Sequence, residues 1–498
     1  MASSVEWNGD VRIPSLQAAY RSGLSLVTVV TKLHERISHY KTTDRAVWIR
    51  LQTLGSLIGE AEALEAKYSD LDHLPPLYGI PFSIKDSIDI AGLPTTTGLS
   101  GFPPLSRTPT SSAPVYDSLI AAGALFVGKT NMDQLATGMT GCRSPYGIPH
   151  SVFSAYHIAG GSSSGSAVSV GARLVSFSIG SDTAGSIRLP AAFNGVVGFK
   201  PTRGMISARG ITPACLSLDC VGVLAGDVDD ARRVWEVVRG YDELDPYAKP
   251  PSTYRDYSTP LSSDDATVSF TFGIPPPDVS AFSACSPIYL KLFSATVQAL
   301  QRAGGSCRQV TAAEWHPFEA AGALLYDGTF VSERLASLPD DWLAANSHHL
   351  HPTIRAVFEA VVARQSTAVQ AYRDLQAKAA YTRQAEHVFQ TVDVVVVPTA
   401  PTQWTIAEVL DDPVRKNSAL GVFSHCANVL DLCAVAVPAG TYPVPRQGGD
   451  DDEGGRGVLP FGITLMSGGR MDEKLLDIAR RYENVRKTID ETGANSPP

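Results

Sequence analysis

Hydrophobic positions in the first 70 residues recur with a helical period. In 15–37 and again in 54–68, apolar side chains return every three or four residues, which places them on one face of a helix. This period predicts that residues 14–70 are helical. The pattern then changes, because 77–92 alternates apolar and polar residues and is interrupted by Gly and Pro. Such alternation predicts an extended segment.

Helical and strand-like patterns alternate along the rest of the chain. Residues 113–131 are typical of a helix followed by a short buried strand, and 228–240 of a capped helix. The remaining predicted elements are helices at 285–305, 354–391 and about 471–486, and strands at 392–398 and 434–442. We therefore expect an α/β fold with a largely buried sheet. No linker separates two self-sufficient halves, so we expect one structural unit.

Composition supports a large folded core and excludes several classes of protein. Of the 498 residues, 44% are hydrophobic and 18% are charged, which argues against disorder. The net charge of −9 and the lack of a dense basic patch argue against nucleic acid as a partner. No apolar run approaches the ~20 residues that span a bilayer, and no signal peptide is expected. Seven cysteines without a CxxC pair favour a reduced, cytoplasmic protein.

Three other segments attract attention by composition. Residues 245–265 and 444–457 are rich in Pro, Ser, Gly and Asp, which predicts flexible loops. The acid run Asp450–Glu453 is either a cation site or a solvated hairpin loop, and base rates for charge runs favour the loop. The histidine cluster at 348–351 lacks partners at zinc spacing. We interpret it as an exposed loop and expect no metal.

Candidate chemistry lies in two serine-rich blocks. Ser186 lies within GSDTAGSIRLP at 180–190, between small residues and a cationic one. Upstream, AGGSSSGSAVSVGA at 159–172 resembles a Gly-rich loop that opens a helix, which is one way to bind phosphate. It lacks both the lysine ending of a P-loop and the GxGxxG spacing, so phosphate binding is disfavoured. A tight strand-to-helix turn with capping serines is the alternative.

A serine nucleophile needs a base, because its free hydroxyl is too weakly acidic. No GxSxG elbow surrounds Ser186, and the nearest histidines lie in no recognisable catalytic pattern. A buried, neutral lysine is the other known partner. Lys85 is the candidate, since it lies in an apolar strand where an unused lysine would be costly. A salt bridge to Asp86 or Asp89 is the alternative, and the local sequence alone slightly favours it.

Three separated blocks together resemble the amidase signature family. In chain order they are YGIPFSIKDSIDIAGLPTTTG, GGSSSGSAVSVGA and GSDTAGSIRLPAAFNGVVGFKPTRG. The resemblance covers about 80–470, and the separation of 24 residues between Ser162 and Ser186 fits the family. It implies a central mixed β-sheet flanked by helices, with an amidase signature domain at 76–498. Residues 1–75 would be an N-terminal helical segment packed on this core.

The resemblance also implies a catalytic set. Ser186 would be the nucleophile, Ser162 a bridging serine after a cis Gly161–Ser162 bond, and Lys85 the base, with no cofactor. Water would release the acyl group from Ser186. The expected oxyanion hole consists of backbone N–H groups from Thr183, Ala184, Gly185 and Ser186. We expect Asp182 and Arg188 to brace this loop by pairing rather than to touch the substrate.

Within the family, the chain looks most similar to allophanate hydrolases, on 128–147, 207–225 and 396–440. There a Tyr and an Arg bind the substrate carboxylate, and Tyr326 and Arg334 correspond to them. Their spacing of eight places both side chains on roughly one face of a helix. The alternative is a surface arginine paired with Glu333 or Asp327.

Two further residues are expected near the same pocket. The resemblance implies that Gly138 lines it or shapes its wall. For Arg143, lining the pocket and a purely structural pairing are equally open.

The resulting hypothesis is an amidohydrolase that releases ammonia from allophanate, a small anionic amide. Alternatives are a urethanase or other small-amide hydrolase on the same residues, and, less favoured, an amidotransferase component that works inside a complex. Many allophanate hydrolases carry a further C-terminal domain, for which 498 residues leave no room. This argues against complete turnover to ammonia and carbon dioxide and leaves open a different substrate, such as a carbamate ester, a malonamate-type acid amide or another amide. The resemblance also allows a homodimer.

Overall fold

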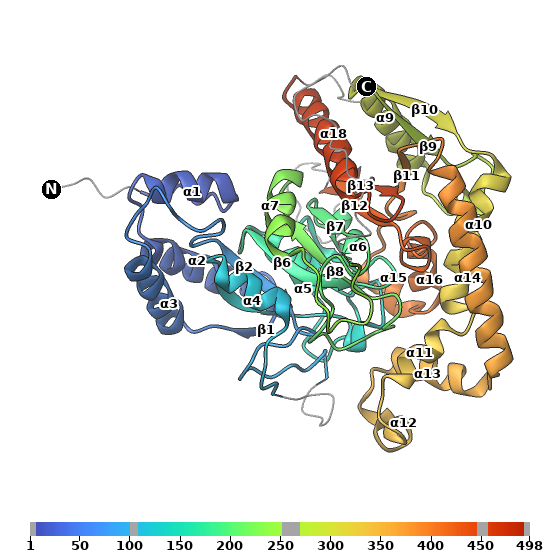
Figure 1. Cartoon of the computed structure of the whole chain (residues 1–498), viewed down its shortest axis with the longest axis horizontal. Helices are drawn as coiled ribbons and strands as arrows, with labels where there is room; N and C mark the ends of the chain where they lie inside the picture. Colours follow the sequence, from blue (N-terminus) through green and yellow to red (C-terminus); the bar gives the residue numbers. More distant parts are fainter. Residues whose placement is uncertain (1–5, 100–107, 251–268, 446–456, 493–498) are drawn as a thin grey trace.

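An eleven-stranded mixed sheet runs through the computed structural model, which describes residues 6–99, 108–250, 269–445 and 457–492 (Figure 1). Strand β2 is parallel to β3 and β6, and β9 is parallel to β10 and β11, whereas the other pairs are antiparallel. In sheet order the strands are β1 (Trp48–Leu51), β3 (Leu125–Thr130), β2 (Pro81–Lys85), β6 (Phe177–Asp182), β8 (Cys220–Ala225), β7 (Val197–Lys200), β12 (Cys433–Val444), β13 (Gly457–Ser467), β11 (Val394–Pro398), β9 (Phe270–Ile274) and β10 (Gly305–Gln309). The α/β fold with a central mixed sheet is confirmed.

Helices cover both faces of this sheet. Two consecutive residues of β7, which face opposite sides of the sheet, each lie against a different helix. The Phe199 ring packs edge-on against Trp235 of helix α7, at 5.6 Å between centroids. A Cβ atom on the preceding Gly198 would lie 2.6 Å from Ala191 of helix α6. Successive strand residues point to opposite faces, so α6 and α7 lie on opposite sides of the sheet. This explains why β2, β6, β7, β8 and β11 are buried along their whole length.

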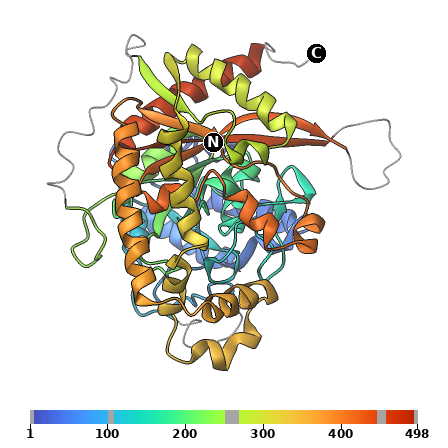
Figure 2. The same cartoon turned by 90° about the vertical axis from the view of Figure 1, so that its right-hand side faces the viewer.

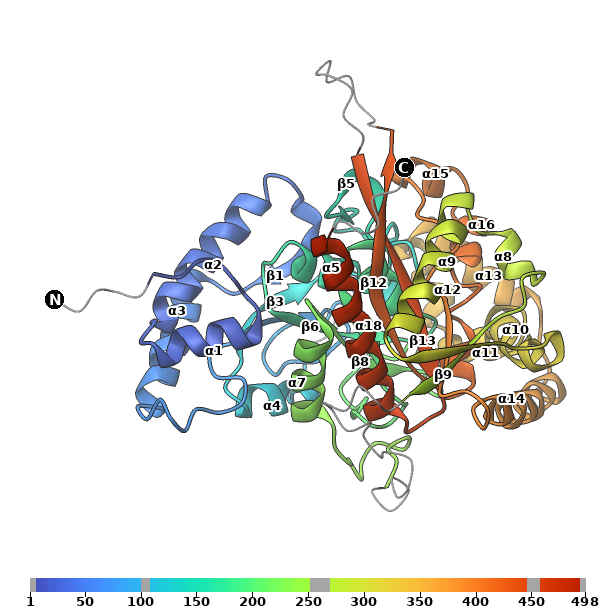
Figure 3. The ribbon, with the colours of Figure 1, turned by 90° about the horizontal axis from the view of Figure 1, so that it is seen from above.

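The helices fall into four groups by position (Figures 1, 2 and 3). The group on the α7 face comprises α4 (Pro114–Ala121), α7 (Val228–Val238), α9 (Pro287–Arg302) and α18 (Asp472–Thr492). The α6 face carries α5 (Ser164–Gly171) and α6 (Arg188–Phe193). At one end lie α1 (Ile13–Arg21), α2 (Leu26–Tyr40) and α3 (Leu54–Lys67). Towards the other end lie α8 (Ser280–Ser283), α10 (Ala312–Tyr326), α11 (Phe330–Ala336), α12 (Trp342–Asn346), α13 (Pro352–Ala363), α14 (Ala368–Val388), α15 (Ile406–Asp411) and α16 (Arg415–Leu420). Helix α17 (Cys426–Val429) packs against α10.

Helices form where the sequence carries caps. Asp227 accepts from the backbone of Asp230 and opens α7, so the capped helix expected at 228–240 is confirmed. A reciprocal capping box of Thr311 and Glu314 opens α10, and a second one of Thr367 and Gln370 opens α14.

Several element predictions were wrong in detail. The region 14–70 is not helical throughout, because β1 at Trp48–Leu51 pairs with β3 at the edge of the sheet. Only Pro81–Lys85 of the extended segment 77–92 is a strand. The segment 354–391 divides into α13 and α14. Short elements such as β1 and β10 are set by pairing with distant strands, which local periodicity does not report.

The parallel strands β2 and β6 determine where the candidate chemistry lies. Carboxyl ends of parallel strands meet at one edge, and Lys85 and Asp182 are the last residues of β2 and β6. Helix α5 begins at Ser164, just after Ser162, and packs against both strands. The loop after β6 carries Ser186 into α6. Residues from three distant segments therefore converge at one sheet edge.

Within the described ranges, none of the helices combines the length and apolar character that a membrane-crossing helix requires. The seven cysteines are free thiols, and six of them are buried.

We expect Gly165→Ala to destabilise the fold, since the added Cβ would lie 2.2 Å from the carbonyl oxygen of Val47, a backbone atom that cannot swing aside. Overpacking of this kind typically costs about 1–3 kcal/mol. The matched control is Gly59→Ala on exposed helix α3, where nothing lies within 4 Å. It should stabilise the chain by about 0.5–1 kcal/mol. Urea unfolding of both variants measures the difference, and equal stability would contradict the packing of α5 described above.

Candidate active site

Lys85 is enclosed at the carboxyl end of β2 and contacts hydroxyl groups rather than carboxylates. Its side chain has no exposed surface, and its Nζ donates to Ser162 Oγ at 2.7 Å and to Ser181 Oγ at 2.9 Å. A longer contact of 3.3 Å reaches the Ser181 carbonyl. Asp86 instead pairs with Lys129 at 3.2 Å. The proposed salt bridge from Lys85 to Asp86 is therefore not formed.

Burial lowers the pKa of Lys85 to about 7. Desolvation penalises the ammonium form and is the largest cause, while the charges of Asp133, Asp182 and Asp219 oppose it in part. The positive charge of Arg334 adds to the depression. A large fraction of the amine is thus neutral near pH 7, which is the form that accepts a proton.

Ser162 follows a cis Gly161–Ser162 peptide bond, as the resemblance implied. Asp133 braces this turn: its backbone N–H donates to the Ser162 carbonyl at 3.2 Å, and its carboxylate accepts from the N–H groups of Gly141 and Arg143. A Cβ on Gly161 would lie 2.1 Å from Asp133 Oδ2, so only glycine fits there. The bridging serine is held by packing and hydrogen bonds on both sides.

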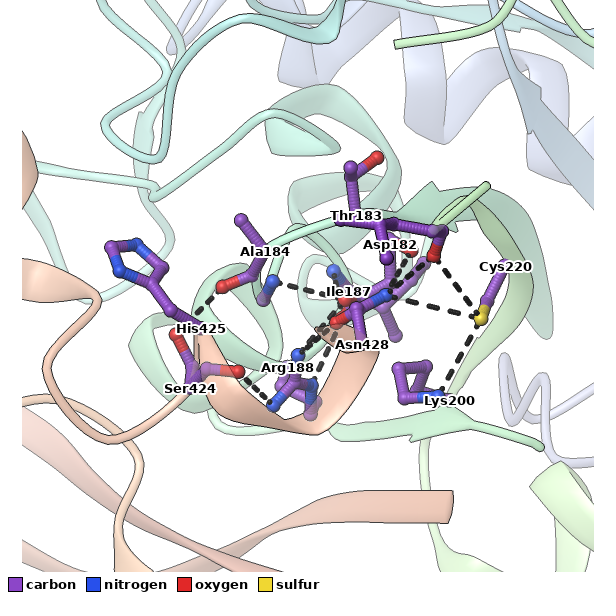
Figure 4. A network of polar contacts seen from close by, with 12 residues as sticks. Asp182, Thr183, Ala184, Ile187, Arg188, Lys200, Cys220, Ser424, His425 and Asn428 are labelled. Carbon is purple, nitrogen blue, oxygen red and sulfur yellow. Dashed lines mark hydrogen bonds and ion pairs between the residues drawn. The ribbon is translucent and has the colours of Figure 1, made fainter. Parts of the chain in front are cut away.

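Ser186 lies in the loop between β6 and α6, which a buried ion pair organises (Figure 4). Arg188 and Asp182 have fully buried side chains and form two hydrogen bonds, at 2.9 and 3.0 Å. Burial alone would raise the pKa of Asp182, but Arg188 lowers it to about 2. The pairing expected for these two residues is confirmed. Among the described residues, the Ser186 hydroxyl has no hydrogen-bond partner and is not sealed from solvent.

One member of the expected oxyanion hole is already engaged. The Gly185 N–H donates to Asp182 Oδ1 at 2.9 Å, so it is not free to receive an oxyanion and this part of the expectation is wrong. Within the described ranges the N–H groups of Thr183, Ala184 and Ser186 have no such partner. Gly185 has a φ of +125°, which lets the loop turn so that these three can converge.

Residues far along the chain hold this loop, and the sequence did not single them out. Asn428 Nδ2 donates to the Asp182 carbonyl at 2.7 Å, and its Oδ1 accepts from Arg188 (Figure 4). Ser424 Oγ donates to the Ala184 carbonyl at 2.8 Å. Asp219 accepts a short hydrogen bond from the Thr183 hydroxyl. Polar residues in irregular segments carry no periodic signal, so only the family blocks pointed to this region.

Arg334 is buried near the catalytic cluster, but not on one helix with Tyr326. Helix α10 ends at Tyr326 and α11 begins at Phe330, so the single helix expected over both residues is wrong. Arg334 is 5% exposed and its Nη1 donates to Thr137 Oγ1 at 2.7 Å. Glu333 instead accepts from Ser217 and Cys215. Within the described residues Arg334 has no ion-pair partner.

A strained turn lies beneath Arg334. Leu135 and Ala136 have φ values of +54° and +50°, unusual for residues with side chains. Arg334 donates to the Ala136 carbonyl, and Arg143 donates to the Thr137 carbonyl at 2.9 Å. The two arginines thus hold a turn in a conformation that persists only where the surroundings enforce it.

Gly138 follows this turn. A Cβ on Gly138 would meet Asp133 at 2.7 Å and Arg143 at 3.1 Å, so the chain passes close to both. Arg143 also donates to the Pro413 carbonyl, while its buried Nε has no partner among the residues that the structure describes. The structural pairing considered for Arg143 is therefore with backbone carbonyls.

The histidine cluster is not a wholly exposed loop. His348 and His349 belong to the short helix η4 (Ser347–His349), and His351 accepts from Thr353 as the cap of α13. In the part of the chain described, no group of three or more His, Cys, Asp or Glu residues is arranged to hold a metal. Asp450–Glu453 lies outside the described residues.

Comparisons place these features among known proteins. A sequence model of the family Amidase matches residues 28–476. The urea amidolyase of Saccharomyces cerevisiae is 36% identical over 438 residues, which make up 87% of this chain and 22% of that protein. The chain therefore spans less than a quarter of that relative's length. One component of the glutamyl-tRNA(Gln) amidotransferase of Symbiobacterium thermophilum is 30% identical over 466 residues, covering 86% of this chain and 88% of that one.

Solved structures give a matching result. An allophanate hydrolase of Kluyveromyces lactis superposes with a TM-score of 0.82 at 33% identity. The superposition covers 97% of this chain and 73% of that one.

We expect Arg188→Met to destabilise the protein by about 3–5 kcal/mol, because it leaves Asp182 charged, buried and unpaired. The control is Arg415→Met, which removes a surface ion pair to Asp412 whose arginine side chain is 83% exposed. Solvent screens that pair, so its loss should leave stability nearly unchanged. Urea unfolding at pH 7 compares the two, and similar midpoints would show that the buried pair does not stabilise the loop.

Proposed function

The chain belongs to the amidase family, and from that premise we propose that it hydrolyses a small anionic amide, allophanate, through an acyl-enzyme on Ser186. The observation that carries this proposal is the fully buried Lys85 with its hydrogen bond of 2.7 Å to Ser162. A largely desolvated amine that is hydrogen-bonded to one serine hydroxyl is an arrangement suited to nucleophilic catalysis. The Ser186 backbone lies close by, because its carbonyl accepts from the Ser163 N–H at 3.3 Å.

We propose the following proton path through these groups. Neutral Lys85 draws a proton from Ser162, which in turn takes the proton of Ser186 as its Oγ attacks the substrate carbonyl carbon. The C–N bond then breaks, and the leaving nitrogen receives the proton back through Ser162, departing as ammonia. Water attacks the acyl-enzyme by the same relay and frees Ser186. Ser181, the second acceptor of Lys85, keeps the amine oriented when Ser162 turns towards Ser186.

Charge that develops on the carbonyl oxygen would be received by the N–H groups of Thr183, Ala184 and Ser186. They need no reorganisation during the reaction, because Asp182, Asn428 and Ser424 already fix their loop. Preorganised donors of this kind are usually among the larger contributions to rate, and the loss of one costs about 10²–10³-fold.

Arg334 supports an anionic substrate. Its buried guanidinium pairs with no carboxylate among the described residues. The free-energy cost of removing this charge from water is therefore not offset by an ion pair, and a bound substrate carboxylate would offset it. Its charge also reaches Lys85, so it lies close to the reacting groups. Tyr326 would complete this carboxylate site, as the resemblance implied, and Gly138 would line the pocket or shape its wall. A neutral carbamate has no use for such a cation, and for this reason we favour allophanate over a urethane.

The cytoplasm is the cellular setting that we propose, because free cysteines suit a reducing compartment. A homodimer remains a proposal: Val369 and Tyr372 of α14 are 59% and 68% exposed, three residues apart, and offer an apolar face to a second copy. A component of an amidotransferase would need its partners, so activity of the isolated chain on small amides would argue against that alternative.

We expect kcat/KM to rise with pH and to level off above an inflection near 7. The base must be neutral, and the pKa of Lys85 is lowered to about 7, so the active fraction grows as pH increases through that value. In Arg334→Gln the inflection should move to higher pH, because the positive charge of Arg334 disfavours protonated Lys85. A pH–rate profile on a neutral amide measures both, and an inflection near 10 would contradict a neutral lysine.

The experiment that tests the function is ammonia release from allophanate, malonamate and ethyl carbamate by wild type, Ser186→Ala and Arg334→Gln. Wild type should prefer the two anions, and Ser186→Ala should be inactive on all three. Arg334→Gln should lose about 10–100-fold in kcat/KM on the anions, as expected for a lost charge-assisted hydrogen bond. Equal activity of wild type and Arg334→Gln on every substrate would overturn the anionic substrate, and inactivity of wild type on allophanate would overturn the function itself.

A further inference from the structure

His425 lies where four segments of the site meet, yet no step described above uses it. Its ring packs against the Tyr326 ring at 4.9 Å between centroids. Its Nε2 lies 3.2 Å from the sulfur of Met139, the residue after Gly138. Ser424, the residue before His425, donates to the Ala184 carbonyl of the proposed oxyanion loop. His425 therefore lies between the carboxylate-binding residues and the loop that faces the reacting carbonyl.

The His425 ring packs closely against the surrounding backbone and side chains. A Cβ on Gly421 would lie 1.7 Å from Nε2 of His425, so the ring rests directly on the glycine backbone. The Met139 methyl group lies 2.9 Å from the Cβ position of Gly185, and the Met139 carbonyl accepts from Gly161, next to the cis bond. Movement of the ring is thereby limited from both sides.

These contacts determine which ring nitrogen is free. A thioether sulfur carries no proton and only accepts, so a hydrogen bond at this contact makes Nε2 of His425 the donor to Met139. The other nitrogen, Nδ1, then carries a lone pair. Among the described residues Nδ1 has no hydrogen-bond partner, and it retains accessible surface. Burial, with the nearby charges of Arg188 and Arg334, lowers the pKa of His425 to about 3, so the ring stays neutral.

We propose that Nδ1 of His425 accepts a hydrogen bond from the N–H group that links the reacting carbonyl to the carboxylate of the substrate. The proposal rests on the proposed function, since it takes the carboxylate at Arg334 and the carbonyl at Ser186. The linking atom of a bound substrate lies between these two ends, as His425 does. His425 is then a specificity-determining residue that distinguishes N-carboxy ureas from acid amides joined by carbon.

Two substrates isolate this contact. Allophanate and malonamate share the amide and the carboxylate, but malonamate has CH₂ where allophanate has the linking N–H. His425→Phe keeps an aromatic ring and removes the acceptor. We expect it to lose about 10–100-fold in kcat/KM on allophanate and less than about threefold on malonamate, because only allophanate then leaves a donor unpaired. The ratio of the two substrates is measured on one protein sample, so partial unfolding does not alter it.

Two further substitutions of His425 test which ring nitrogen accepts the hydrogen bond. In His425→Asn the amide oxygen takes nearly the place of Nδ1 and can accept, whereas in His425→Gln the amide lies nearer the place of Nε2. Asparagine should recover the preference for allophanate, and glutamine should not. His157→Phe is the matched control: His157 is also largely buried and bonds Ser154 outside the site, so its loss should leave the ratio unchanged.

Three results would overturn the proposal. Equal losses on both substrates in His425→Phe would make His425 purely structural, and rescue by glutamine as good as that by asparagine would exclude Nδ1. In either case wild-type activity on allophanate leaves the proposed function standing. If wild type does not act on allophanate at all, the proposed function fails, and the role of His425 fails with it.

Discussion

Desolvation of one amine is the constraint on which the site depends. Three carboxylates, Asp133, Asp182 and Asp219, lie near enough to Lys85 to favour its charged form, yet burial outweighs them. Each carboxylate is engaged elsewhere: Asp133 by backbone N–H groups, Asp182 by Arg188, and Asp219 by Thr183 and by backbone. Within the described residues, the hydrogen bonds of Nζ go to oxygens of two serines instead. Lys85 is thus close to several carboxylates but forms no ion pair with them, and a large fraction of the amine is neutral near pH 7.

The ion pair of Asp182 and Arg188 also shapes the loop that carries Ser186. Asp182 accepts from Gly185, Ile187 and Arg188, so its carboxylate folds the backbone of 183–187 around itself. The N–H groups it does not bind are left pointing elsewhere. A buried ion pair can therefore help to form an oxyanion hole. When its carboxylate binds some backbone N–H groups of a tight loop, the directions of the other N–H groups in that loop are fixed as well. Anchoring by Ser424 and Asn428 ties this geometry to the segment that begins α17.

Some features of the fold and of the candidate site could be predicted from the sequence and others could not, depending on whether a feature produces a local sequence pattern. Long periodic helices such as α2 and α7 could be predicted, since an amphipathic face repeats along the chain. The convergence of Lys85, Ser162 and Ser186 could not, because it requires β2 and β6 to be parallel neighbours, and only the family blocks implied it. The break between α10 and α11 had a local signal, because the Asp-Gly pair at 327–328 is typical of a turn. The prediction from the eight-residue spacing of Tyr326 and Arg334 did not take this pair into account. Asp133, Asp219 and Asn428 had none, since a polar residue in a loop is indistinguishable from a solvated one until its partners are known.

Different segments of the chain supply the residues proposed for the reaction and those proposed for substrate specificity. The residues that we propose to react lie on the sheet edge and its adjoining turns, next to the ends of the parallel strands β2 and β6. The residues that we propose to face the far end of a small substrate come from separate segments: the strained turn at 135–137, the junction of α10 and α11, and the start of α17. These three meet one another through Arg334, Met139 and His425 rather than through the sheet. Substitutions there can change which amide is accepted while Lys85 and its serines keep their geometry, so specificity on this fold can vary independently of the chemistry.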